Sequence, residues 1–485
     1  MLQMTRHNSM DVDAGETNKK LPRVNSFDVF DTILARRVLQ PSDIFDIVEK
    51  NFPFEGYAQI RKEAEKINGL TFDTIFKEFK RLSGCDDAII TALREFEIET
   101  ECANCYLIAS NNVLVQDGDI LVSDMYMLDS EIRTMLRRAG FDKNVVIYSS
   151  SSGMSKCSGS MYKFLLERYD IASHSGDNPI SDIVMAQKYQ IRTRQTRVSA
   201  VNATEHFFHV RNKIGLAQML REFRLQNPYL EKSYEYALYE DQIVHNIPIL
   251  FMLSYNLSEM MRKENLSLLL LLTRDGCLLY EIFRTLFPNI NCCLLQSSRR
   301  MHNFANDDYK QYLKEHYIPG HSLIFDLHGS FQSGRVLYRE LFGQYPRVHL
   351  FTYCGAENAL FDTLTFSFLA SNDYIERFNS DVIGTLLTMR NGEFARRDVE
   401  VEYSYDDAMI YRNCVLSFCQ FIMQPRFAQV LQDETVGSDL RGFYESNRER
   451  RPHIHYRIPP EIDVLNPSIV VNPSKRRGFG MVYTK

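Results

Sequence analysis

The chain has 485 residues, enough for two or more domains, and its 45% hydrophobic and 24% charged content is ordinary for a soluble globular protein. Its net charge of −6 argues against a general nucleic-acid-binding surface. No stretch approaches the roughly 18 apolar residues of a membrane span, so we expect none.

Residues 1–21 are polar and lack the apolar core of a signal peptide, so we expect a disordered leader. The ten cysteines are scattered, several of them in apolar segments, which is typical of reduced core thiols. Cys102 and Cys105 have CxxC spacing, but they have no second pair and lie in a helical pattern, which favours plain packing. These features predict a cytoplasmic location.

Strands alternate with helices over residues 22–205. We expect strands at 24–27, 120–123, 145–149 and about 171–175, with a helix after each of the last three. A long helical pattern at about 38–112 interrupts this alternation. The alternation of strands and helices, together with this helical pattern, predicts a Rossmann-like parallel sheet with helices on both faces and a helical insertion. In such sheets, ligands bind at the carboxyl ends of the strands.

The alternation begins again near residue 234. A helix is expected at 247–263, with strands at 266–272, 322–325 and 349–353. This pattern predicts a second α/β domain over residues 230–395. Residues 396–485 contain a helical segment and a basic tail with several prolines, which is typical of an extended segment. The tail or the second domain is where we expect a protein partner to bind.

Reactive side chains cluster at or just beyond the predicted strand ends of the first domain. A carboxylate that ends an apolar strand, as Asp28 does, is costly unless it is paired or bound to a cation. Two acids that bracket a tight turn can bind a hard cation, and a lysine can neutralise a transferring phosphoryl group. The side chains are those of Asp28, Thr32, Ser123, Lys156, Asp177 and Asp182.

The order and spacing of these residues resemble the haloacid dehalogenase-like (HAD) superfamily, and the segment FDVFDT at 27–32 resembles one of its predicted-hydrolase branches. The resemblance implies a phosphohydrolase in which Asp28 attacks phosphorus and carries an aspartyl-phosphate. It implies that Thr32 positions the loop and that Ser123 binds a phosphoryl oxygen. It also implies that Lys156 neutralises the negative charge of Asp28 and of the transferring phosphoryl group. Residues 38–112 would form the cap domain.

The same resemblance implies one Mg²⁺ ion. Its ligands would be the Asp28 carboxylate, the backbone carbonyl of Phe30 and Asp177, with Asp182 in support. The implied substrate is a small phosphorylated metabolite such as a sugar phosphate.

One position departs from the phosphatase pattern of that superfamily. Phe30 stands where phosphatases carry an acid–base aspartate, and Asp31 follows where glycine is usual. General acid–base catalysis is commonly worth about 10²–10⁴-fold, so its loss matters. Three hypotheses remain open: a phosphatase in which Asp31 substitutes, a non-catalytic phosphate-binding or assembly protein, and a metal-independent dehalogenase-like hydrolase. The retained Asp177 and Asp182 argue against the third.

The second domain resembles the downstream region of the same branch, in segments 272–276, 297–300 and 325–334. Arginines there would grip a phosphate or a carboxylate through paired hydrogen bonds, and aspartates follow apolar strands. Equally, the Asp-Gly and His-Gly pairs would serve as turns and the arginines as surface ion pairs. The candidate residues are Arg274, Asp275, Arg299 and Asp326, and no reaction follows from them.

Overall fold

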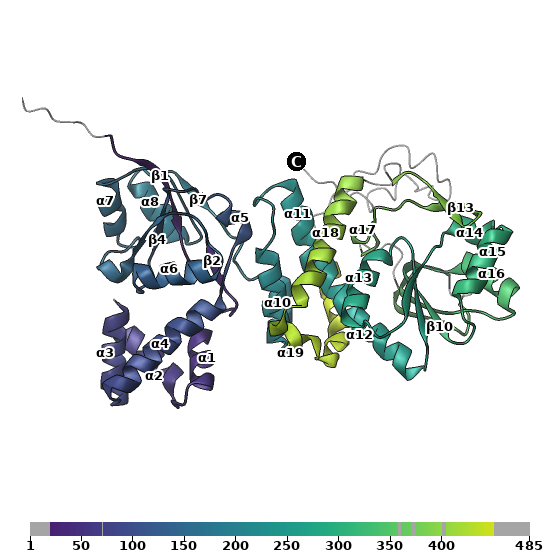
Figure 1. The fold of residues 1–485 in the computed structure, drawn as a ribbon, viewed down its shortest axis with the longest axis horizontal. Coiled ribbons are helices and arrows are strands. Elements are labelled where there is room, and N and C mark those ends of the chain that lie inside the picture. Colours follow the sequence, from purple (N-terminus) through teal and green to yellow (C-terminus); the bar gives the residue numbers. More distant parts are fainter. Residues whose placement is uncertain (1–19, 70, 357–359, 370–374, 400–403, 451–485) are drawn as a thin grey trace, which may run out of the picture. The chain divides into compact units, whose positions relative to one another are not determined.

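The computed structural model describes residues 20–69, 71–356, 360–369, 375–399 and 404–450. The predicted leader therefore lies almost wholly outside the described residues, as does the expected tail beyond residue 450. The chain divides into two compact units, coloured along the sequence in Figure 1. Unit 1 contains Met1–Leu34, Ile44–Ala103 and Leu114–Arg197, and unit 2 contains Ala35–Asp43, Asn104–Val113 and Val198–Lys485.

Unit 1 is built on a five-stranded sheet in the order β5-β4-β1-β6-β7, with every neighbouring pair parallel. Strands β4 and β5 lie on one side of β1, and the later strands β6 and β7 lie on the other side. The strand order therefore reverses between β1 and β6. This confirms the predicted parallel sheet. The strands are β1 (Arg23–Asp28), β4 (Ile120–Ser123), β5 (Val146–Ser149), β6 (Asp170–Gly176) and β7 (Thr193–Gln195).

Helices pack on this sheet and shape its carboxyl edge. Apolar residues of β1, β4 and β6 form one core cluster with α7, including Val122 and Tyr162. After β6 the chain enters a π-helical turn, η2, because the Asn178 side chain accepts hydrogen bonds from Ile180 N and Ser181 N and caps it. The helices are α6 (Asp129–Arg138), η1 (Ser150–Ser152), α7 (Ser160–Leu166), η2 (Pro179–Val184) and α8 (Met185–Lys188).

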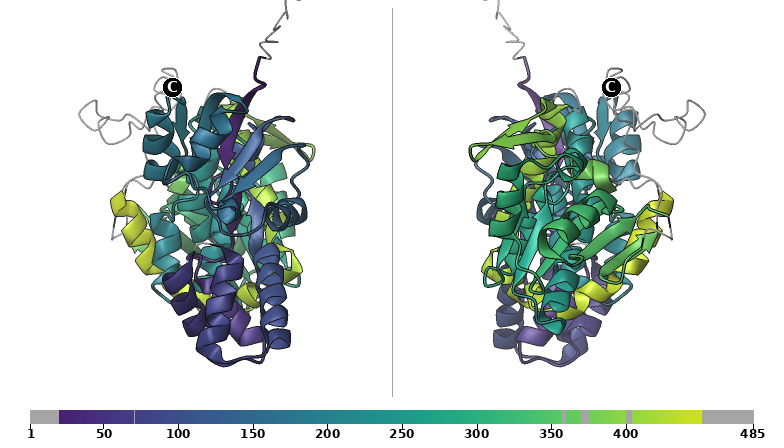
Figure 2. Two further views of the ribbon diagram at one scale, coloured as in Figure 1. Left: turned by 90° about the vertical axis from the view of Figure 1, so that its left-hand side faces the viewer. Right: turned by 90° about the vertical axis from the view of Figure 1, so that its right-hand side faces the viewer.

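The predicted helical insertion lies between β1 and β4 in the chain, and its four helices stand as a separate layer of unit 1 in Figures 1 and 2. Thr71 begins the third helix with a capping box, and Gly84, at φ 70°, ends it. The four helices are α1 (Asp43–Asn51), α2 (Tyr57–Asn68), α3 (Phe72–Ser83) and α4 (Asp87–Asn104).

A buried arginine holds the four helices together. The guanidinium of Arg61 makes two hydrogen bonds of 2.9 and 2.8 Å to the buried carboxylate of Glu97, which also accepts from Tyr57 Oη. Arg61 Nη2 donates to Tyr126 Oη at 2.8 Å, and the Tyr126 ring stacks on Phe72. Because Tyr126 lies in the loop after β4, this network also fixes the insertion to the sheet layer of unit 1.

The two connections that lead into and out of the insertion belong to unit 2. They contain β2 (Leu34–Arg36) and β3 (Cys105–Leu107), which pair with each other, and α5 (Ala109–Asn112). Tyr106 and Ile108 are buried in a cluster with residues of unit 2, and Arg37 forms a double hydrogen bond with Glu222. The insertion helices therefore occupy a shorter segment than the expected residues 38–112.

Unit 2 is built on a second five-stranded sheet in the order β12-β11-β10-β8-β9, again with every pair parallel. This confirms the predicted second α/β fold, and here the strand order reverses between β8 and β10. An antiparallel hairpin of β13 (Leu386–Arg390) and β14 (Glu393–Arg396) follows. The parallel strands are β8 (Leu268–Leu272), β9 (Cys292–Leu295), β10 (Ser322–Gly329), β11 (Arg347–Tyr353) and β12 (Leu364–Leu369).

Helices from both ends of unit 2 share one core. Phe418 and Phe223 pack with ring centroids 5.2 Å apart, and Phe443 stacks on Phe208. The helical segment expected after residue 396 is thus part of this core. No helix in the described residues is long and apolar enough to cross a membrane. The helices are α9 (Ala203–His209), α10 (Ile214–Leu225), α11 (Tyr234–Asp241), η3 (Gln242–Asn246), α12 (Ile247–Lys263), α13 (Cys277–Leu286), α14 (Arg299–Asn303), α15 (Asp307–His316), α16 (Gln332–Phe342), α17 (Ile375–Phe378), α18 (Tyr405–Ile422), η6 (Pro425–Phe427), α19 (Ala428–Leu431), η7 (Glu434–Asp439) and α20 (Leu440–Arg450).

Candidate active site

Four chain segments of unit 1 bring charged side chains to the carboxyl edge of the sheet. Asp28 is the last residue of β1, Asp177 directly follows β6, and Asp182 lies in η2. Lys156 comes from the loop after η1. This place is the carboxyl end of β1 and β6, where the strand order reverses and where open parallel sheets bind their ligands.

The three aspartates form a cluster that fits a divalent cation. One carboxylate oxygen from each of Asp28, Asp177 and Asp182 lies within 4.8 Å of the others. A Cβ atom on Gly176 would lie 2.3 Å from Asp182 Cγ, so only glycine leaves room for that carboxylate. Hard oxygen donors of this kind suit Mg²⁺ or Ca²⁺. The donor set therefore agrees with the cation expected from the sequence.

Lys156 bridges two of these acids. Its Nζ donates to Asp28 Oδ1 and, at 2.5 Å, to Asp182 Oδ1, and its side chain is only 2% exposed. Burial alone would lower the pKa of Lys156, but the charges of Asp28 and Asp182 outweigh burial and raise it above its ordinary value. The lysine therefore stays cationic.

Asp124 holds the loop that carries Lys156. Its Oδ1 accepts from Lys156 N at 2.6 Å, and its Oδ2 accepts from Cys157 N at 3.2 Å. A carboxylate that accepts two consecutive backbone N–H groups fixes the loop and so sets the place of the lysine ammonium group.

Negative charge exceeds positive charge in the cluster. Burial raises the pKa of Asp28 to about 8, and the charges of Asp182 and Asp177 add to this, while Lys156 opposes it. Burial also raises the pKa of Asp177 to about 6, with help from Asp31 and Asp182. One lysine thus faces several carboxylates, and a divalent cation would compensate the remaining negative charge.

The raised pKa of Asp28 predicts how stability depends on pH once metal is removed. The pKa of Asp28 is about 8 in the folded protein, whereas its ordinary value, which applies to the unfolded chain, is 3.8. Between pH 3.8 and about pH 8 the folded state therefore binds more protons than the unfolded state. The free energy of unfolding of EDTA-treated protein should therefore fall as pH rises through this window. Thermal unfolding between about pH 5 and pH 9 measures it. Asp28→Asn should show a smaller fall, and parallel curves for the two proteins would contradict the prediction.

Asp31 lies in the tight turn after β1. Its φ of 56° is in the left-handed region, which glycine, asparagine and aspartate tolerate best. Val29 O accepts from both Ile33 N and Leu34 N at 2.8 Å, and Asp31 N donates to Leu34 O. The Asp31 charge raises the pKa of Asp177, so its carboxylate is within electrostatic reach of the cluster. Phe30, half-buried, precedes it in the same turn.

The two predicted hydroxyl residues are both buried beside β1. Thr32 lies in the turn, 0% exposed. Ser123 follows Val122, the residue that pairs with Asp28 across β1 and β4, and its Oγ accepts from Met125 N at 3.1 Å. Because that bond uses a lone pair of Ser123, its O–H hydrogen can serve a ligand oxygen.

Two residues that sequence reasoning missed complete the site. His174, in β6, places Nε2 3.2 Å from Asp182 Oδ1 and Nδ1 2.8 Å from Ser26 Oγ. Burial lowers the pKa of His174, and the charge of Lys156 lowers it further, so the ring is neutral. No local sequence signal singles out Ser26 and His174, because β1 and β6 each contain several polar residues and the pairing of these two depends on the strand register.

In unit 2, three of the four second-domain candidates lie near the carboxyl end of β8. Arg274 and Asp275 follow that strand, and Asp326 lies in the neighbouring strand β10. Burial raises the pKa of Asp326 well above its ordinary value; Asp275 and Glu376 raise it further, and Arg274 opposes them. These residues lie where the order of the second sheet reverses, between β8 and β10. Arg299 is exposed at the start of α14, and no hydrogen bond or ion pair joins it to the other three.

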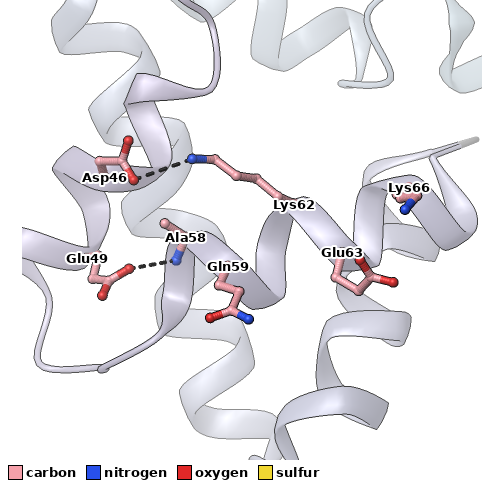
Figure 3. Close-up of a pocket in the computed structure, with 7 residues that line it drawn as sticks. All are labelled: Asp46, Glu49, Ala58, Gln59, Lys62, Glu63 and Lys66. Atoms are coloured by element: carbon pink, nitrogen blue, oxygen red, sulfur yellow. Dashed lines mark hydrogen bonds and ion pairs between the residues drawn. The ribbon is translucent and has the colours of Figure 1, made fainter.

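A surface depression of about 530 Å³ lies on the outer side of α1 and α2 (Figure 3). Lys62 crosses it to reach Asp46, and Glu49 accepts a hydrogen bond from Ala58 N. Its lining contains none of the residues of the aspartate cluster. The candidate active site is therefore the aspartate cluster at the carboxyl edge of the sheet and not this depression.

Comparison with known proteins leaves the family of the chain open, because no family model and no curated protein matches its sequence. The chemistry of the site is therefore argued from its residues and from the topology of its sheet. Three carboxylates and a lysine at a strand-order reversal are what a metal-assisted reaction on an anionic group requires.

Proposed function

We propose that this chain is a Mg²⁺-dependent, HAD-like phosphohydrolase that acts on a small phosphorylated metabolite. The observation that carries the proposal is the cluster of Asp28, Asp177 and Asp182 with Lys156 between two of its members. Asp28 is the nucleophile because it ends the central strand and faces the lysine. The cysteines of the chain are present as thiols, which supports a cytoplasmic location.

The first step transfers the phosphoryl group to Asp28. An Oδ atom of Asp28 attacks phosphorus, the bond between phosphorus and the ester oxygen breaks, and the ester oxygen takes a proton from Asp31. Ser123 donates its hydroxyl hydrogen to a phosphoryl oxygen. Lys156 keeps the nucleophile and the incoming phosphate from repelling each other.

The second step releases phosphate. A water oxygen attacks phosphorus, the bond from phosphorus to Asp28 breaks, and Asp31 takes a proton from the water, which returns both carboxyl groups to their starting states. Asp28, the carbonyl of Phe30 and Asp177 would hold Mg²⁺, with Asp182 in support. When bound, the ion supplies positive charge that stabilises the phosphoryl oxygens.

Hydrolysis of p-nitrophenyl phosphate and of a panel of phosphorylated metabolites tests this proposal. We expect turnover with Mg²⁺, its loss on treatment with EDTA and its return when Mg²⁺ is added back. The panel should include sugar phosphates, because these are the substrates that the resemblance to the HAD superfamily implies. A protein that is inactive across the panel, or whose turnover survives EDTA, would refute the proposal.

Phe30 favours a second candidate function, that of a protein that binds phosphate without hydrolysing it. A phenylalanine cannot protonate a leaving group, so the site would recognise a phosphoryl group through Lys156 and the cation alone. Thermal stabilisation by phosphate and Mg²⁺ without turnover would support this candidate. Absence of any stabilisation would exclude it.

A further inference from the structure

A fully buried imidazole lies behind the aspartate cluster and has no part in the proposed chemical steps. His174 is 0% exposed and comes from the middle of β6, where it pairs in register with Ser26 of β1. Ser26 is also 0% exposed and precedes the nucleophile Asp28 on the same strand. A buried, hydrogen-bonded polar pair contributes little stability over an apolar pair of the same shape. Its role must therefore be sought in what it contacts.

The hydrogen bonds around His174 set which ring nitrogen carries the proton. Asp182 is an acceptor when it is ionised, so Nε2, 3.2 Å from its Oδ1, carries the hydrogen. Nδ1 is then an acceptor, and the Ser26 hydroxyl, 2.8 Å away, donates to it. Asp182 therefore fixes the tautomer, and the Ser26 hydroxyl, which can donate or accept, fits the nitrogen that Asp182 leaves without a hydrogen.

The ring is also held in place by packing. The edge of the Tyr162 ring meets the imidazole with the centroids 5.4 Å apart and the planes at 81°. Tyr162 Oη donates to Ser181 O at 2.9 Å, next to Asp182 in the chain. One tyrosine thus fixes both the imidazole and the backbone of η2.

Asp182 itself is oriented from two sides. Its Oδ1 accepts from Lys156 and from His174, and its Oδ2 accepts from Asn178 N at 3.0 Å. Without His174, Lys156 would be the only side chain that holds Oδ1. The ammonium group would then be drawn to Asp182 at the expense of Asp28, and the carboxylate would be less well placed for a cation.

We propose that His174 is a positioning residue that donates its Nε2–H to Asp182, orients that carboxylate and thereby sets the affinity of the aspartate cluster for Mg²⁺. This inference rests on the cation site of the proposed function. It concerns cation binding rather than turnover, so it fails or stands independently of the hydrolysis assay.

The test is calorimetric titration of Mg²⁺ into the full-length protein without substrate. Replacing a group that orients a metal ligand typically costs about 10–100-fold in metal affinity. We therefore expect His174→Phe, which keeps a ring but removes the donor, to weaken Mg²⁺ binding by that factor. His174→Gln, whose amide N–H can replace Nε2–H, should stay close to wild type. His209→Phe, at an exposed position of α9, is the matched control and should leave affinity unchanged.

A second measurement covers the case in which His174→Phe does not fold. Nitrogen-15 spectra of the imidazole distinguish the two tautomers, and we expect Nε2–H in wild type and also in Ser26→Ala, because the ionised Asp182 can only accept. The proposal is overturned by wild-type affinity in His174→Phe, by an Nδ1–H tautomer in wild type, or by a wild-type protein that binds no Mg²⁺.

Discussion

Asp28→Asn should reduce the turnover of p-nitrophenyl phosphate by more than about 10³-fold, to the level of buffer alone. An amide cannot form the aspartyl-phosphate on which both chemical steps depend. The substitution is close to isosteric, and Lys156 keeps its 2.5 Å contact with Asp182, so the fold should persist. Steady-state hydrolysis at saturating Mg²⁺ measures the effect.

The control for this loss is the same substitution at an exposed position of unit 1. Asp142 is 76% exposed at its side chain, and its ion pair is with the neighbouring Lys143 rather than with a residue of the cluster. Asp142→Asn should therefore retain wild-type turnover. Equal activity of wild type and Asp28→Asn would show that any hydrolysis arises elsewhere, and the nucleophile assignment would be wrong.

Asp31→Asn should lower kcat by about 10²–10⁴-fold for an alkyl phosphate, because its poor leaving group needs a proton. The loss should be smaller for p-nitrophenyl phosphate, whose phenolate leaves without one, provided that phosphoryl transfer to Asp28 limits the rate. Asparagine accepts the left-handed φ of 56° that position 31 requires, so the backbone of the turn should be kept. Comparison of the two substrates with one variant separates loss of the acid from general damage.

Unchanged turnover of both substrates in Asp31→Asn would exclude Asp31 as the acid–base group. The acid–base role would then have no assigned residue, because the carboxylates of Asp177 and Asp182 are placed to hold the cation. Such a result, together with slow turnover in wild type, would favour the phosphate-binding candidate.

The sequence predicted four strands of the sheet of unit 1, β1, β4, β5 and β6, and each is found within a few residues of its expected place. The apolar runs of β4 and β5 mark them clearly, whereas β6 has the more polar sequence DIASHSG. β7 was missed because Thr-Arg-Gln at 193–195 is short and polar. Its strand character comes from parallel pairing with β6, which no local pattern records.

The parts of the site that escaped prediction depend on contacts between distant residues. Asp124 fixes Lys156 across a separation of 32 residues, and His174 meets Ser26 across 148. Both arrangements follow from the strand order of the sheet. The order of the motifs predicted the reactive residues. The residues that hold them in position could not be predicted without the register of β1 and β6.

The connections around the insertion illustrate the same limit. Their residues were expected to belong to the cap because they lie between the first two motifs. Tyr106 and Ile108 are instead buried against residues of unit 2, such as Leu225, that come more than a hundred positions later. Hydrophobicity predicts that such side chains are buried but does not predict their partners.

A crystal structure of the protein with Mg²⁺ and fluoroberyllate, a mimic of a transferred phosphoryl group, tests the central claim most directly. The account predicts beryllium bonded to an Oδ atom of Asp28, Lys156 Nζ beside the fluorides, and Mg²⁺ in contact with Asp177 and the carbonyl of Phe30. It also predicts that the Asp31 carboxylate points toward the beryllium. Density for fluoroberyllate away from Asp28, or a cation that avoids Asp28 and Asp177, would contradict it.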